Sequence, residues 1–161
     1  MTTDDRSPEM KRRGTAYHEA GHAVAALDAE FRFRAVSLRP EDIGESPYRH
    51  GGVLDIELPS PGRAGLIPAR RGRPLAALAE REETGGARGW LADRMEIENH
   101  VAIGGTTGAR ANYKWQAARK ARALLKVRWA EVRAIAEALL EHERLEYEQV
   151  ARIAAAARGS T

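Results

Sequence analysis

The first strong hydrophobic pattern of the chain places small and apolar residues at every third or fourth position, which is the spacing of one helix face. Ser7 and Pro8 precede it, and a serine cap followed by proline at the first helical position is a typical helix start. The pattern therefore predicts a helix from Ser7 to Leu27, with Gly14 as a point where it can be interrupted. The apolar face consists of Ala16, Ala20, Ala23, Val24 and Leu27.

Two short segments after this helix have the pattern of β-strands. In residues 31–38, apolar and polar side chains alternate until Arg39 and Pro40 end the run. In residues 51–58, leucine and isoleucine side chains share one face, and the acidic side chains fall on the other. We expect the two strands to pair as a β-hairpin.

Residues 59–89 form a Pro/Gly/Arg-rich segment, in which we expect one short helix from Leu75 to Glu83. The segment is interpreted either as a lid beside a cleft or as a disordered insertion. No aromatic residue is interleaved with its arginines to stack on bases, so we expect a solvated loop and no nucleic-acid partner. Four of the arginines lie close together in the sequence, at Arg63, Arg70, Arg71 and Arg73.

From Trp90 onward the pattern is helical. One of the predicted helices carries an apolar stripe at helical spacing, which we expect to enter the core. The sequence thus predicts a single domain over residues 1–161 that is mainly α with a small β-hairpin, an α+β fold. The predicted helices cover residues 90–103, 112–127, 128–142 and 147–157, and the stripe consists of Trp129, Val132, Ile135, Ala136 and Leu139.

Composition narrows the possible classes of protein. The chain has 161 residues and a net charge of +3, which fits one globular domain with a mild basic excess. It has no cysteine, which excludes a disulfide scaffold, a thiol nucleophile and a cysteine zinc site. No apolar run approaches the roughly 20 residues that a transmembrane helix needs, and residues 1–11 lack the apolar stretch of a signal peptide. We therefore expect a cytoplasmic protein without a transmembrane segment.

The most informative motif is His18-Glu19-Ala20-Gly21-His22, which lies on the first predicted helix. Residues four apart share a helix face, so His18 and His22 can both direct a ring nitrogen at one Zn²⁺ ion about 2 Å away. Glu19 projects beside them and can take a proton from a water activated by the metal. The spacing therefore predicts a metallopeptidase whose third protein ligand comes from another part of the chain.

The stretch Thr15-Ala16-Tyr17-His18-Glu19-Ala20-Gly21-His22-Ala23-Val24-Ala25 resembles the active-site helix of the FtsH-type zinc peptidases. Residues 101–105 are similar to the family's apolar segment that ends in a glycine pair, and residues 129–150 to its C-terminal helices. The resemblance implies a zincin-like, mostly helical peptidase domain in which the two motif histidines and a distant aspartate bind zinc and the glutamate is the general base. The chain has no P-loop pattern, so we expect a freestanding peptidase domain without the ATPase module.

The third zinc ligand is the open point of this interpretation. The stretch Gly108-Ala109-Arg110-Ala111-Asn112-Tyr113 best matches the family's aspartate motif, and it puts Asn112 at the ligand position. An amide oxygen is a poorer zinc ligand than a carboxylate, so other residues stay candidates. Carboxylates of the preceding predicted helix and one acidic residue after the motif are the alternatives, and three lone histidines are interpreted as surface residues. The alternatives are Asp93, Glu96, Glu98 and Asp28, and the histidines are His50, His100 and His142.

The sequence supports a zinc-dependent metalloendopeptidase that acts on polypeptides with Glu19 as catalytic base and His18, His22 and Asn112 around the metal. A catalytically weakened domain that binds proteins is the alternative, since Asn112 then marks decay of the metal site. A purely structural zinc site is a third hypothesis. A separate ATPase or unfoldase, or a second copy of the chain, is the expected partner besides the substrate.

Overall fold

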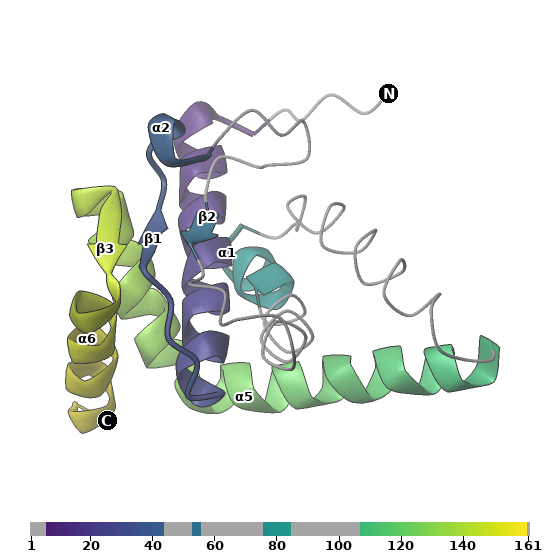
Figure 1. Cartoon of the computed structure of the whole chain (residues 1–161). Helices are drawn as coiled ribbons and strands as arrows, with labels where there is room; N and C mark the ends of the chain where they lie inside the picture. The colour runs from purple at the N-terminus through teal and green to yellow at the C-terminus, as the bar shows by residue number, and fades with distance from the viewer. Residues whose placement is uncertain (1–5, 44–52, 56–75, 85–106, 161) are drawn as a thin grey trace.

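The computed structural model describes residues 6–43, 53–55, 76–84 and 107–160, and Figure 1 shows their arrangement. In the described part of the chain the fold is mostly helical with a small antiparallel sheet, as the sequence predicted. Residues 76–84 form a short helix, which confirms the helix expected from Leu75 to Glu83. The labelled elements are α1 (Pro8–Asp28), β1 (Ala35–Ser37), α2 (Pro40–Ile43), β2 (Val53–Asp55), α5 (Thr107–His142), β3 (Arg144–Glu146) and α6 (Tyr147–Gly159).

Helix α1 begins where the sequence predicted. Ser7 is its N-cap, and the Ser7 hydroxyl accepts a hydrogen bond of 3.2 Å from the amide of Met10. Gly14 does not interrupt the helix. A Cβ atom at this position would lie 3.2 Å from the Thr84 methyl carbon and 3.5 Å from Cγ of Glu80. The missing side chain of Gly14 therefore lets the helix of residues 76–84 approach α1 closely.

The predicted hairpin is confirmed. Strands β1 and β2 pair in antiparallel fashion, with Val36 opposite Leu54. A third strand, β3, pairs with the other side of β1 and places Val36 opposite Leu145, which gives the order β2-β1-β3. The sequence analysis missed β3, because three residues between two helices carry no strand pattern of their own.

The turn before β3 explains its position. Glu143 has a φ of 63°, a left-handed conformation that ends α5 and reverses the chain. Its carbonyl accepts a 2.7 Å hydrogen bond from the amide of Leu38, just after β1. The amide of Tyr147 donates to the carbonyl of Arg34 at 3.1 Å, so both ends of β3 are fastened to the β1 segment.

The prediction of separate helices over residues 112–127 and 128–142 was wrong, since α5 is one continuous helix from Thr107 to His142. No glycine or proline lies between Asn112 and His142, and alanine, leucine, arginine and lysine favour continuation. In Figure 1 the helix changes direction along its length, so that its later part packs beside α1 while its earlier part extends away.

The core lies between α1, the later part of α5, α6 and the sheet. The predicted stripe of α5 is buried, with Val132, Ile135, Ala136 and Leu139 fully inaccessible, and the small residues of α1 pack against it. Trp129 packs against this core, and its ring lies 5.7 Å from the ring of Tyr17 between centroids. In the described ranges, none of the helices combines the length and apolar character that a membrane span requires.

A buried carboxylate of α5 joins this helix to the C-terminal ends of α1 and α6. Glu131 on α5 is only 1% exposed, and the guanidinium of Arg128 holds it with two hydrogen bonds. Arg158 of α6 approaches the same carboxylate at 3.3 Å. Arg128 also donates to Asp28 at 3.1 Å, so the last residue of α1 is joined to the cluster. The charge of Glu131 is therefore compensated by two arginines, as burial requires.

Asp42 of α2 is fixed between β1 and β3. The hydroxyl of Ser37 donates to Oδ2 of Asp42 at 2.6 Å, and Nη1 of Arg144 donates to the same oxygen at 3.0 Å. The hydrogen bond from Ser37, and then that from Arg144, lowers the pKa of Asp42 below its ordinary value. The ionised carboxylate thus joins one helix to two strands.

The depressed pKa of Asp42 predicts a loss of stability in acid. The stabilisation is present above the ordinary pKa of 3.8 and is lost as the pH falls through the lower folded value. We expect the urea midpoint of the wild type to fall more between about pH 6 and about pH 2 than that of Asp42→Asn. Glu41→Gln, at the exposed neighbouring position, is the control and should behave like the wild type. Parallel pH profiles of the wild type and Asp42→Asn would contradict the prediction.

Candidate metal centre

The motif histidines lie together on α1. The ring centroids of His18 and His22 are 4.9 Å apart in an edge-to-face arrangement, as expected for residues one helical turn apart. His18 and Glu19 are each 6% exposed, whereas His22 is half-buried. His18 and Glu19 therefore lie in a sheltered environment, and His22 is partly open to solvent.

A carboxylate that the sequence analysis did not identify reaches the first histidine. Oε2 of Glu80, in the helix of residues 76–84, lies 3.2 Å from Nδ1 of His18. Glu80 is 4% exposed, and its neighbours Ala76 and Ala79 are fully buried. The only signal in the sequence was the helical spacing of Glu80 from Ala76, which places an acidic residue on an apolar helix face.

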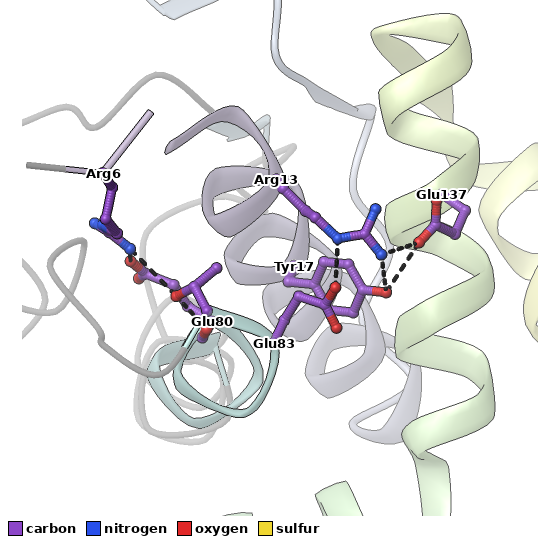
Figure 2. Close-up of polar contacts among 7 residues, drawn as sticks. Arg6, Arg13, Tyr17, Glu80, Glu83 and Glu137 are labelled. Carbon is purple, nitrogen blue, oxygen red and sulfur yellow. Dashed lines mark hydrogen bonds and ion pairs between the residues drawn. The ribbon is translucent and has the colours of Figure 1, made fainter. Parts of the chain in front are cut away.

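Arg6 provides positive charge on the other side of this carboxylate. Its Nη1 atom lies 3.6 Å from Oε1 of Glu80 and donates a hydrogen bond of 3.2 Å to the hydroxyl of Thr84. Figure 2 shows Arg6 and Glu80 facing one another beside α1. The two oxygens of Glu80 therefore face different partners, one an arginine just ahead of α1 and the other a histidine within it.

A second polar cluster holds three helices against one another (Figure 2). Arg13 of α1 donates to Glu83 of the short helix, and its Nη2 atom donates to Glu137 of α5 at 2.6 Å. The hydroxyl of Tyr17 donates to the same Glu137 oxygen at 3.0 Å. Burial, and then the hydrogen bond to Glu137, raises the pKa of Tyr17 to about 12. The bond to Glu83 raises the pKa of Arg13, so this cation stays charged.

These contacts determine where Glu80 lies. Glu80 and Glu83 are three residues apart on the same short helix, so they lie near one another on its surface. The Arg13–Glu83 ion pair fixes the helix against α1, and the close approach at Gly14 sets its distance. Glu80 is thereby placed beside His18 by contacts one helical turn away.

The described residues supply two of the predicted metal ligands. Within residues 6–43, 53–55, 76–84 and 107–160, no three or more histidine, cysteine, aspartate or glutamate side chains are grouped so as to hold a metal ion. Asn112 belongs to α5, but its side chain lies outside what the structure describes. Outside the described residues lie the alternative ligands Asp93, Glu96 and Glu98, and also His50 and His100, which the sequence analysis interpreted as surface residues.

The structure also describes the alternative ligand Asp28 and the lone histidine His142. Asp28 is at the far end of α1 and accepts a hydrogen bond from Arg128. His142 is exposed at the end of α5, 3.8 Å from the carboxylate of Glu141, as expected for a surface residue. Neither joins His18 and His22.

The donors that are present fit zinc. Imidazole nitrogens are among its usual ligands, and two of them share one helix face with a buried carboxylate beside them. No protein-family model matches the chain, and no curated protein matches it. The functional interpretation therefore depends on the motif residues and on the geometry described above.

Proposed function

We propose that this chain is a zinc-dependent metalloendopeptidase with a zincin-like domain that resembles the FtsH-type peptidases. The observation that carries the proposal is the pairing of His18 and His22 on one face of α1, with the buried Glu19 directly after His18 in the sequence. A protein that only binds others has no chemical need for a carboxylate beside two imidazoles. An acid–base residue next to two metal ligands is what hydrolysis with an activated water requires.

The roles of the chain's own residues follow from their positions. His18 and His22 would hold Zn²⁺, which when bound polarises the scissile carbonyl and makes a water acidic near neutral pH. Glu19 takes the proton from the attacking water and then delivers it to the leaving amine nitrogen, as general base and then acid. The buried surroundings of His18 and Glu19 shelter this proton transfer from bulk water.

Strand β2 is the candidate for holding the substrate. It lies at one edge of the three described strands, and α1 contacts both β1 and β2. An extended peptide that adds to such an edge would lie along a strand next to the motif helix. The substrate class is therefore a polypeptide in extended conformation.

The zinc content of the purified chain, together with cleavage of casein, tests the proposal. A peptidase predicts bound zinc and cleavage that stops when a chelator removes the metal. The alternative is a weakened domain that binds proteins, and the observation that favours it is Asn112 at the expected aspartate position. That alternative predicts a wild-type chain that is metal-free and does not cleave casein. A separate unfoldase or a second copy as partner, and a cytoplasmic location, stay predictions.

Asn112→Asp is expected to raise zinc affinity, because a carboxylate is a better zinc ligand than an amide oxygen. The measurement is the dissociation constant of zinc, obtained by competition with a chromophoric chelator. Gln116→Glu is the matched control, because it adds the same charge one turn further along α5 at an exposed position. An equal increase in both variants, or none in Asn112→Asp, would show that residue 112 is not the ligand position.

A further inference from the structure

We infer that Glu80 is a positioning residue of the metal centre: its carboxylate holds the His18 ring with the proton on Nδ1, so that Nε2 is the nitrogen that binds zinc. The inference rests on the proposed function, because it assigns a role towards the same metal. The observation that carries it is the 3.2 Å contact between Nδ1 of His18 and Oε2 of Glu80.

The chemistry of the two groups sets the direction of this hydrogen bond. An ionised carboxylate has acceptor atoms only, so the imidazole nitrogen that faces it must donate. A neutral imidazole carries one ring proton, and with that proton on Nδ1 the lone pair is on Nε2. A metal needs this lone pair. Histidines that bind metals almost always donate their other N–H to such an outer partner, which fixes the ring and makes it a stronger ligand.

Burial strengthens the interaction between His18 and Glu80. The side chains of His18 and Glu80 are 8% and 5% exposed, so water screens their interaction poorly. Arg6 lies 3.6 Å from the other oxygen of Glu80, and its charge balances that of the buried carboxylate. Glu80 can therefore stay in contact with His18 without leaving an uncompensated buried charge.

The position of Glu80 also separates it from the ligands themselves. It comes from a different element than His18, and it does not complete a metal-holding group with His18 and His22 in the described residues. Its carboxylate faces Nδ1, the ring atom opposite the expected metal-binding nitrogen. The geometry thus fits a residue that acts through His18 and not one that binds the ion directly.

Two measurements on the full chain test this inference. Long-range ¹H–¹⁵N spectra of the metal-free wild type, at a pH where the ring is neutral, give the tautomer of His18, and we expect the proton on Nδ1. Chelator competition then gives zinc dissociation constants for the wild type, Glu80→Ala, Glu80→Gln and Glu82→Gln. Glu82 is exposed on the same short helix, so Glu82→Gln is the matched control.

We expect Glu80→Ala to weaken zinc binding by about 10- to 100-fold, as is usual for loss of an outer-shell partner. Glu80→Gln keeps the size of the side chain and an acceptor oxygen, so it should fold and bind zinc with intermediate affinity. Glu82→Gln should match the wild type. Circular dichroism at the assay temperature shows which variants are folded. If Glu80→Ala is unfolded, the zinc affinity of Glu80→Gln tests the inference.

Two results would overturn the inference alone: a wild-type His18 with its proton on Nε2, or zinc bound equally tightly by the folded Glu80 variants and the wild type. A purely structural Glu80 predicts the second result, with lower melting temperatures and unchanged zinc affinity. A wild-type chain that binds no zinc would overturn the proposed function as well. The two failures are therefore distinguishable.

Discussion

Glu19→Gln is expected to abolish casein cleavage while the protein keeps its zinc. Glutamine has nearly the same shape as glutamate but cannot accept the proton of the attacking water. His18 and His22, which would hold the metal, are unchanged. Loss of general acid–base catalysis costs about 10²- to 10⁴-fold in rate, so kcat should fall by at least that factor. The measurements are zinc content by elemental analysis and the rate of casein cleavage.

Glu9→Gln is the control for this variant, because Glu9 is an exposed residue in the first turn of the same helix. It should keep both zinc and cleavage. If Glu19→Gln cleaves casein at the wild-type rate, Glu19 is not the base and the proposed mechanism fails. Loss of zinc together with cleavage would instead give Glu19 a role in holding the metal.

Leu139→Ala is expected to lower the free energy of unfolding by about 2–5 kcal/mol, the usual cost of removing a buried leucine side chain from a packed core. Leu139 is fully inaccessible and belongs to the cluster that joins α5 to α1. Truncation leaves a cavity in this core cluster. Urea unfolding followed by circular dichroism gives the free energy, and an unchanged m-value shows that only stability has changed.

Val127→Ala is the matched control on the same helix, because the Val127 side chain is 80% exposed. Its removal should change the free energy of unfolding by less than about 0.5 kcal/mol, as is usual for surface positions. Similar losses in the two variants would contradict the packing of α5 described here, because that packing buries one residue and exposes the other.

Local patterns predicted the helices and the hairpin well. The N-cap at Ser7, the pairing of β1 with β2 and the start of α6 at Tyr147 each follow from a few neighbouring residues. The apolar stripe of α5 was likewise predicted, because burial repeats with the helical period. The division of this helix at residue 127 was wrong, because no residue there stops a helix and the structure continues it.

Features that join distant parts of the chain were not predicted. Strand β3 forms because both of its ends are hydrogen-bonded to the β1 segment more than a hundred residues earlier. The local sequence Arg144-Leu145-Glu146 does not predict this pairing. Glu80 was missed for the same reason, since it lies 62 residues from His18 in the chain. The motif identified the pair of histidines, while the partner of His18 depends on how two helices meet.

At Gly14, a gain in helix stability would conflict with the geometry of the contact between His18 and Glu80. Alanine there would favour α1 by about 1 kcal/mol through helix propensity. Its methyl group would also push against Thr84 at 3.2 Å, on the helix that carries Glu80. A substitution one turn ahead of His18 would thus stabilise α1 but weaken the contact between Glu80 and the His18 ring. Selection for a more heat-resistant version of this protein would meet that conflict at Gly14.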